Sequence, residues 1–469
     1  MIKILSKTYD FSKKAEDIFL TFLDESMLFF LDSSVSVSGR GRFSFIGFKP
    51  FDVVCQDGKD ALDVLKRKFY EHQIKVENSL VPFSCGAVGF LGYELGSEEG
   101  KTSFKKETDL SLPDCFFGFY SHVIAIDHEL NKLHIIATGM PEKNDSLREK
   151  KALSDLQYIE KKLNEKYIES EKITDSSSHD FLESFDFKSN FTKSQYLDVV
   201  DRALEYIKEG DIYQVNLSQR FLFKRNSENP KDLARLYMLL RKVSPSSFGA
   251  YFDTGEFQVI SSSPEEFLKK RDMYVETSPM KGTRPRSQSL IDDEIFRREL
   301  LQSTKEKAEL LMVTDLERND LGKVCIPGSV RVRLMRTLEE YKTVFQTTST
   351  VEGLLDKDKN VFDVLSACFP SGSVTGCPKI RAMQIIKELE PNSRGPYTGS
   401  LGYIGFDENM DFNILIRTLI AKKDMLSFHV GGGIVADSIA ENEYYETLLK
   451  AVALQKSIMS IFLQESGAR

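Results

Sequence analysis

The chain has 469 residues, enough for one large domain or two to three ordinary ones with a sizeable buried core. Its composition, 41% hydrophobic and 29% charged, is typical of a soluble globular protein. The net charge of −8 argues against a chain-wide basic surface for nucleic acid or anionic lipid, and no apolar run approaches the ~20 residues that span a bilayer.

The cysteines and the amino terminus indicate a cytoplasmic protein. The six cysteines are scattered without a C-x-x-C pair, and Met1 to Lys14 lacks the continuous apolar segment of an export signal. The six histidines form no H-E-x-x-H pattern, which argues against a histidine-based zinc site. We therefore expect reduced thiols and a cytoplasmic location.

The chain up to residue 140 reads mainly as strands and turns. Strands are expected in 38–47 and 86–93, and the apolar segments 123–127 and 132–137 predict a hairpin. Residues 141–169 predict an exposed amphipathic helix, and 169–190 has the weak periodicity of a linker. This divides the chain into an amino-terminal region, 1–172, and a second region, 190–466.

The second region opens with a capping box, Thr192 and Gln195, before a helix that is expected to end at Gly210. The strand that follows places Gln214, Asn216, Ser218 and Arg220 on one face, which is either solvated or lines a cavity. Further strands are predicted at 249–252, 257–262, 274–277, 330–334, 401–406, 412–420 and 426–430, and helices at 293–315, 361–367, 380–389 and 441–463. Strands and helices without strict alternation predict an α+β fold.

The stretch 276–286 contains one amine, that of Lys281. Two prolines restrict the backbone of this segment, and Gly282 lets the backbone approach a ligand closely. A lysine on such a turn is a nucleophile if its surroundings lower its pKa from about 10.4; otherwise it belongs to a basic surface turn. Glu265 follows a predicted strand. It is either an acid that protonates a leaving group or an ordinary loop carboxylate.

Two pairs of glutamates have helical i, i+3 spacing: Glu306 with Glu309, and Glu443 with Glu446. Each pair alone is typical of a solvated helix face. Two such pairs opposite one another indicate a cation between them, and oxygen ligands without His or Cys favour Mg²⁺ over zinc.

Two glycine-rich segments and one arginine complete the candidates. Gly431, Gly432 and Gly433 are expected after a strand, where exposed N–H groups hold an anion, but neither they nor residues 371–379 match a phosphate-loop pattern. Arg417 lies in an otherwise apolar predicted strand, where it needs a structural carboxylate or an anionic ligand as partner.

Taken together and in this order, several segments resemble the chorismate-utilising enzyme family. They are 210–220, 263–265, 279–283, 315–322, 376–379, 394–397, 416–418 and 431–438. The resemblance is strong from 190 to 465. Residues 41–47 and 86–96 look like the amino-terminal region of the anthranilate and aminodeoxychorismate synthase large subunits. The resemblance implies an anthranilate synthase component I-like fold, with large mixed or antiparallel sheets packed as a sandwich and surrounded by helices.

Within this family, single positions distinguish the reactions. The Pro-x-Lys-Gly-Thr segment at 279–283 is similar to the aminodeoxychorismate synthase branch, whereas anthranilate synthases typically carry Ala at the position of Lys281. Isochorismate and salicylate synthases carry a water-activating lysine where this chain has Gln214. The resemblance thus implies that Lys281 attacks ring carbon 2 of chorismate and Glu265 protonates the departing 4-hydroxyl. Ammonia then gives 4-amino-4-deoxychorismate, a precursor in para-aminobenzoate and folate synthesis.

The resemblance also implies ligands and partners. Mg²⁺ is expected on a substrate carboxylate, held by Glu309 and Glu446 with help from Glu306 and Glu443. Chorismate is expected to contact Gly282, Thr283, Tyr397, Arg417, Gly431, Gly432 and Gly433. No stretch reads as a glutamine amidotransferase, so ammonia is expected from a separate glutaminase subunit.

Several positions depart from the family pattern. Gln346 stands where many members have His, a residue linked to pyruvate elimination in the anthranilate-forming members; Ser373 and Cys377 replace the usual Thr and Ala. The stretches 31–33 and 247–249 differ from the motifs of the family's tryptophan site. The alternatives are anthranilate synthase component I and, more remotely, an inactive regulatory subunit that binds chorismate or an amino acid.

Overall fold

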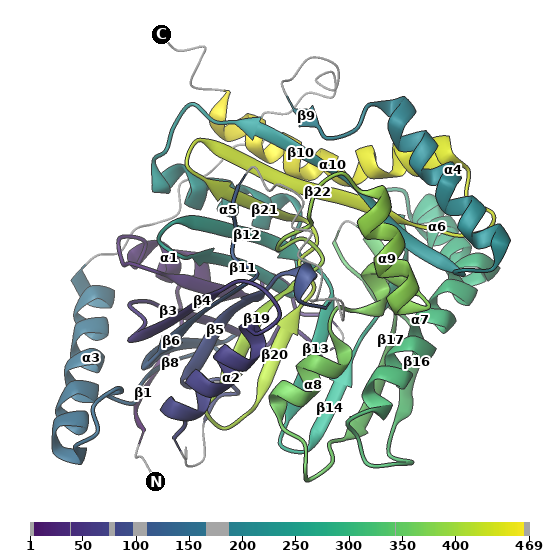
Figure 1. Ribbon diagram of the computed structural model, residues 1–469. Helices are drawn as coiled ribbons and strands as arrows, with labels where there is room; N and C mark the ends of the chain where they lie inside the picture. Colours follow the sequence, from purple (N-terminus) through teal and green to yellow (C-terminus); the bar gives the residue numbers. More distant parts are fainter. Residues whose placement is uncertain are drawn as a thin grey trace.

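In a computed structural model, the described residues, 4–37, 39–74, 80–96, 110–165, 187–342 and 344–463, form two large antiparallel sheets and ten α-helices (Figure 1). The first sheet has twelve strands: β1 (Leu5–Asp10), β8 (Lys132–Ala137), β7 (His122–Asp127), β3 (Phe43–Gly47), β2 (Phe29–Asp32), β11 (Phe248–Asp253), β12 (Phe257–Ser263), β21 (Thr418–Lys422), β22 (Met425–Ile434), β10 (Gln214–Lys224) and β18 (Gly376–Cys377), with β9 (Lys188–Ser189) beside β10.

The second sheet has ten strands. In order they are β15 (Met280–Pro285), β17 (Val344–Leu354), β14 (Tyr274–Thr277), β13 (Glu266–Arg271), β20 (Met410–Asn413), β19 (Ser400–Gly405), β5 (Gly86–Leu91), β6 (Cys115–Tyr120) and β4 (Asp52–Gln56), with β16 (Arg331–Glu340) beside β17. The helices are α1 (Ala15–Thr21), α2 (Ala61–His72), α3 (Asp145–Glu165), α4 (Lys193–Glu209), α5 (Pro230–Val243), α6 (Leu290–Gln302), α7 (Thr304–Gly322), α8 (Val361–Cys368), α9 (Lys379–Leu389) and α10 (Ala440–Phe462).

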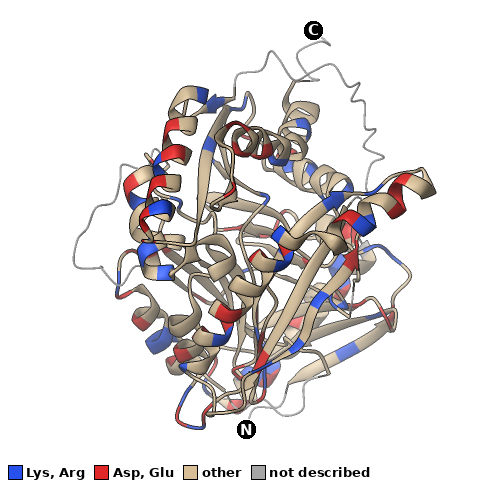
Figure 2. Cartoon of the chain, turned by 90° about the vertical axis from the view of Figure 1, so that its right-hand side faces the viewer, with Lys and Arg blue, Asp and Glu red and all other residues tan. Residues whose placement is uncertain are grey.

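The two sheets pack face to face, with helices on their outer faces. One apolar cluster lies between the sheets and joins Phe29 and Phe252 of the first to Phe90 and Leu401 of the second. A second cluster joins the first sheet to α1, α3, α5 and α10, and a third joins the second sheet to α2, α7 and α8. Many of the Lys, Arg, Asp and Glu positions lie on the helices (Figure 2). The predicted sandwich surrounded by helices is confirmed.

Both sheets draw strands from both ends of the chain. In the first, β2 of the amino-terminal region pairs with β11, Gly249 opposite Asp32. In the second, β5 pairs with β19, Ser400 opposite Leu91. The division into 1–172 and 190–466 stays a prediction, and most of the expected linker lies outside the described residues. The sheets themselves are common to the two regions.

Several local predictions hold. Thr192 and Gln195 form the capping box of α4, and Gly210 ends the helix in the left-handed conformation with φ 85°. The β7–β8 hairpin and helices α8, α9 and α10 lie within a few residues of the expected positions. None of the described helices combines the length and apolarity that crossing a membrane requires.

Four predictions were wrong in detail. The helix expected at 293–315 is two helices, α6 and α7, because Ser303 interrupts it and accepts a hydrogen bond from the Glu306 N–H. The strand expected at 412–420 is β20 and β21, which belong to different sheets. The glycines 431–433 lie inside β22 and pair with β10. Lys281 lies on the short strand β15 and not on a turn.

Candidate active site

Lys281 lies at an irregular point of the second sheet. β15 pairs with β17, and the register shifts between Lys281 and Thr283 because Gly282 adopts a φ of +80°. Such a bulge re-aims the neighbouring side chain. A Cβ on Gly282 would lie 2.9 Å from Glu306 Oε2, so only glycine fits between β15 and α7.

The Lys281 amine points into the protein. Its Nζ donates a hydrogen bond to the Ser373 carbonyl at 3.2 Å, and a Cβ placed on Gly433 would stand 3.6 Å from it. Burial lowers the pKa of Lys281, although the Glu309 and Glu265 carboxylates oppose the shift. The amine is therefore more easily deprotonated than an exposed lysine, as a nucleophile requires.

Glu265 is a buried acid next to this amine. It follows β12, is 5% exposed, and accepts a hydrogen bond from the Met280 N–H at 3.3 Å. Burial raises the pKa of Glu265, while hydrogen bonding to Ser373 and the charge of Lys281 lower it less strongly. A carboxyl group that keeps its proton beside an amine that loses its own is the arrangement of a general acid with a nucleophile.

The polar face of β10 is buried and belongs to the same site. Gln214 is 1% exposed, and neither atom of its side-chain amide has a hydrogen-bond partner among the described residues. A Cβ on Gly433 would lie 2.7 Å from Gln214 Nε2, so Gly433 keeps open the space between Gln214 and Lys281. Of the two readings of this strand face, the solvated one is wrong, because all four polar residues are buried, and Arg220 lines a small cavity.

Arg417 lies where the chain crosses from β20 in one sheet to β21 in the other. Its backbone is left-handed, with φ 50°, and no described residue forms a hydrogen bond or ion pair with its guanidinium group. Burial lowers the pKa of Arg417, although Tyr341 and Glu265 oppose this. A half-buried guanidinium without an acceptor among the described residues fits an anionic ligand.

Thr283 and Gln346 face each other across β15 and β17. Gln346 Nε2 donates a hydrogen bond to Thr283 Oγ1 at 3.3 Å, and Gln346 Oε1 is buried without a partner among the described residues. A carboxamide has no basic nitrogen, so Gln346 cannot act as the base that a histidine would provide there.

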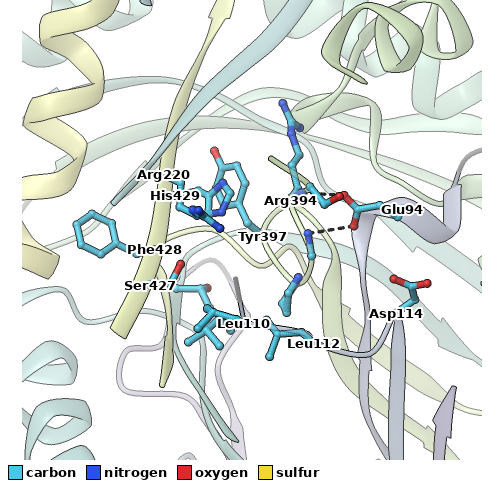
Figure 3. Close-up of a pocket in the computed structure, with 15 residues that line it drawn as sticks. Glu94, Leu110, Leu112, Asp114, Arg220, Arg394, Tyr397, Ser427, Phe428 and His429 are labelled. Carbon is cyan, nitrogen blue, oxygen red and sulfur yellow. Dashed lines mark hydrogen bonds between the residues drawn. The ribbon is translucent and has the colours of Figure 1, made fainter. Parts of the chain in front are cut away.

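Tyr397 lines a small cavity next to the glycines of β22. The ring stacks on His429, with centroids 4.9 Å apart, and burial raises the pKa of Tyr397 to about 12 (Figure 3). The cavity of about 50 Å³ continues past Arg394, whose N–H donates to Glu94 at 2.7 Å. A Cβ on Gly431 would lie 2.9 Å from the Tyr397 hydroxyl, so the Tyr397 side chain lies next to the glycines of β22.

The four predicted metal ligands approach one another from α7 and α10. Glu306 pairs with Arg284 at 2.7 Å, Glu443 accepts from the Ser438 hydroxyl at 2.7 Å, and Glu446 pairs with Lys450 at 2.7 Å. Burial raises the pKa of Glu309, and the charges of Glu306 and Glu446 raise it further. Burial also raises the pKa of Glu446, but Lys450 outweighs it and the net shift is downward.

The donor chemistry of this cluster fits a hard divalent cation. All four side chains offer carboxylate oxygens, and Glu306 Oε2 is buried without a partner among the described residues. Within the described ranges, however, no three His, Cys, Asp or Glu side chains gather closely enough to hold a metal ion. Arg284 and Lys450 each neutralise one of the carboxylates that a cation would need.

The two segments that differ from the motifs of the family's tryptophan site meet in a second cavity, of about 320 Å³. Residues 31–33 and 247–249 line it together with Arg40 and Glu266. The Asp32 carboxylate accepts hydrogen bonds from the Tyr237 hydroxyl at 2.9 Å and from Arg241 at 2.6 Å, so it already has partners within the protein.

Sequence reasoning did not place the turn at 371–374 beside the catalytic candidates. Ser373 of this turn contacts both Lys281 and Glu265. On the α7 side, Glu317 Oε1 accepts a hydrogen bond from the Gly372 N–H of the turn at 2.9 Å. Both residues lie in or next to segments that carried the family resemblance, at 315–322 and 376–379. Only the three-dimensional structure shows that these segments meet.

Residues 33–456 match the family of chorismate binding enzymes. Anthranilate synthase component 1 of Acetivibrio thermocellus is 34% identical over 475 residues, 98% of this chain and 95% of that protein. Aminodeoxychorismate synthase component 1 of Bacillus subtilis (strain 168) is 34% identical over 437 residues, 89% of each. The crystal structure of anthranilate synthase component I from Streptococcus pneumoniae TIGR4 superposes with a TM-score of 0.76 at 31% identity, covering 90% of this chain and 93% of that one.

The chain therefore belongs to the chorismate binding enzyme family, and its fold is that of anthranilate synthase component I. It is an enzyme that acts on chorismate. The relatives named above catalyse two different reactions at the same level of identity, so the particular reaction has to be argued from the site.

Proposed function

We propose that the chain is the synthase subunit of an aminodeoxychorismate synthase, which converts chorismate and ammonia to 4-amino-4-deoxychorismate and water. The observation that carries this proposal is the pair formed by Lys281 and Glu265. Burial lowers the pKa of the amine and raises the pKa of the acid, which favours the protonation states that the reaction needs.

In the first half of the reaction, the neutral Lys281 amine forms a bond to ring carbon 2 of chorismate. Both ring double bonds shift, and the 4-hydroxyl leaves with the proton of Glu265 as water. Ser373 accepts a hydrogen bond from Lys281 through its carbonyl and so orients the amine toward the substrate.

In the second half, ammonia forms a bond to ring carbon 4, both ring double bonds shift back, and the bond between carbon 2 and Lys281 breaks. The lysine leaves as an amine, and the proton that ammonia loses returns to Glu265. Gln346 offers no base for the elimination of pyruvate. This supports a product that keeps its enolpyruvyl group.

Chorismate binding is assigned to residues around the cavity-lining strands. Arg417 suits bidentate capture of a carboxylate, because its half-buried guanidinium has no acceptor among the described residues. Tyr397 and Thr283 offer hydroxyl groups, and the glycines 282 and 431–433 let the substrate approach the backbone.

Mg²⁺, bound by Glu309 and Glu446 with Glu306 and Glu443, would neutralise a carboxylate of the substrate. Until it binds, Arg284 and Lys450 hold the carboxylates of Glu306 and Glu446 in place. Ammonia would come from a separate glutamine amidotransferase subunit, since nothing in the sequence reads as a glutaminase with a nucleophilic cysteine.

Anthranilate synthase is the second candidate, because the relatives of this chain include anthranilate synthase component 1 proteins at 34–36% identity over most of their length. That reaction adds ammonia at carbon 2, the position that Lys281 attacks in our proposal, and eliminates pyruvate.

The identity of the product decides between these functions. The purified chain would be incubated with chorismate, Mg²⁺ and ammonium, and the product identified by mass spectrometry. We expect 4-amino-4-deoxychorismate with no release of pyruvate. Anthranilate together with an equal amount of pyruvate would overturn the proposal, and no turnover would favour the regulatory subunit.

A further inference from the structure

A chain of four buried side chains connects Glu265 to a second acid behind the site. Glu317, on α7, is fully buried, and its Oε1 accepts a hydrogen bond from the Ser371 hydroxyl at 3.0 Å. The Ser371 hydroxyl lies 3.1 Å from the Ser373 hydroxyl, and either of them can be the donor. Ser373 is also the side chain whose hydrogen bonding lowers the pKa of Glu265. The four groups therefore form one continuous path between two carboxyl groups.

We propose that Glu265 and Glu317 share one proton along this path, so that Glu317 acts on the reaction through Glu265. In one state the proton resides on Glu265, and each hydroxyl donates toward an ionised Glu317. In the other state the proton resides on Glu317, and the hydroxyls of Ser371 and Ser373 donate in the direction of an ionised Glu265. The two states differ only by the shift of one proton at each link. The inference deepens the proposed function, on which it rests.

The packing around Glu317 buries this path and fixes its geometry. Its Oε1 also accepts from the Gly372 N–H at 2.9 Å, and its Oε2 is buried without a partner among the described residues. A Cβ on Gly372 would lie 2.4 Å from Leu316 Cδ2, so the turn rests directly against α7. Serine hydroxyls donate and accept at once, which is the property that a proton path requires.

The charges around both ends favour a shared proton. Burial raises the pKa of Glu317 to about 7, opposed by Lys379 and reinforced by Asp320. The charged groups facing the two carboxyls are Lys379 and Asp320 at the Glu317 end, and Lys281, Arg40 and Arg417 at the Glu265 end. Burial also raises the pKa of Glu265, so neither carboxyl strongly prefers to lose the proton to water.

The path balances the protons of the reaction. The shared proton passes from Glu317 through Ser371 and Ser373 to Glu265, and Glu265 gives it to the departing 4-hydroxyl, which leaves both carboxyls ionised. After ammonia has bonded to carbon 4, the proton that the nitrogen loses enters at Glu265, and the same path returns one proton to Glu317. No proton has to come from water while the substrate fills the site.

Three variants separate a proton path from a structural contact. Glu317→Gln keeps an oxygen that accepts from Ser371 and Gly372, but it cannot exchange a proton. Ser371→Ala interrupts the path and leaves both carboxyls. The matched control is Thr375→Val, which removes the hydrogen bond from the Thr375 hydroxyl to the Ser371 carbonyl at 2.8 Å but lies off the path.

The rate of chorismate consumption would be measured in mixtures of H2O and D2O. For the wild type and Thr375→Val we expect a curved dependence on the D2O fraction, the signature of several protons in motion. For Glu317→Gln and Ser371→Ala we expect a linear dependence and a rate lower by about 10-fold, less than the roughly 10²–10⁴-fold contribution of a direct proton donor because Glu317 acts only through Glu265. A curved dependence that survives in Glu317→Gln or Ser371→Ala, or one that Thr375→Val loses equally, would overturn the proposal.

A measurement without turnover supports the same test. Infrared spectra of Glu265→Gln recorded between pH 5 and 9 should show a protonated carboxyl band that titrates near neutral pH and is absent from the double variant Glu265→Gln, Glu317→Gln. Its persistence in that variant would contradict the assignment. Product identity in the wild type tests the proposed function separately, because the isotope comparison among variants holds for whichever product forms.

Discussion

Replacing Gly433 by alanine probes the space between Lys281 and Gln214 with a single methyl group. The new Cβ would stand 3.6 Å from Lys281 Nζ, an ordinary contact, and 2.7 Å from Gln214 Nε2, the movable end of a side chain. The fold can therefore absorb the methyl group by moving Gln214, at a cost of about 1–3 kcal/mol in the free energy of unfolding. The methyl group then occupies the space assigned to chorismate. We expect kcat/KM to fall by about 10–200-fold, the range for one misplaced carbon in a binding pocket.

The assay is steady-state turnover of chorismate together with thermal unfolding of each variant. Gly322→Ala is the control, because a Cβ on this last residue of α7 meets nothing within 4 Å. The control should keep its activity and gain about 0.4–1 kcal/mol of stability. If Gly433→Ala folds and keeps the kcat/KM of the wild type, chorismate does not occupy this space and the site has been misplaced.

Three further predictions test the roles of individual residues. Because Lys281 must be neutral and Glu265 protonated, the rate should rise with pH through the lowered pKa of the amine and fall above the raised pKa of the acid. Glu265→Gln should slow turnover by about 10²–10⁴-fold and abolish the falling limb of the pH profile; a retained limb would assign it to another group. Glu309→Gln or Glu446→Gln should raise the Mg²⁺ concentration for half-maximal rate by at least about 10-fold, and an unchanged titration would remove them as ligands. Arg417→Met should raise KM for chorismate by about 10–100-fold, the loss expected for hydrogen bonds to a charged group, and an unchanged KM would exclude Arg417 from binding.

The sequence predicted the elements whose signals are local. The capping box at Thr192 and the left-handed Gly210 bound α4 as expected, because both depend on backbone groups within one helical turn. The polar face of β10 was visible in the alternation of its residues, but the sequence left open whether it was solvated or lined a cavity. Burial of Gln214 depends on β18 and β22, which lie far along the chain.

The errors arose where tertiary contacts decide the local structure. Residues 412–420 have the apolar pattern of one strand, yet the chain leaves one sheet and joins the other there, with Arg417 in a left-handed conformation at the crossing. The glycines 431–433 suggested a loop because glycine weakens strands. They are tolerated in β22 because Tyr397, Gln214 and the glutamates of α10 fill the space where side chains would lie. No local signal shows which segments meet around Lys281.

The most direct test of the central claim is the detection of a covalent bond between chorismate and Lys281. The protein would be incubated with chorismate and Mg²⁺ without ammonia, quenched and digested, and the peptide that contains Lys281 weighed. The account predicts a mass increase equal to chorismate minus one water on that residue, and no such adduct in Lys281→Ala. An adduct that persists in Lys281→Ala, or a wild type that turns over chorismate and ammonia yet never forms an adduct, would contradict it.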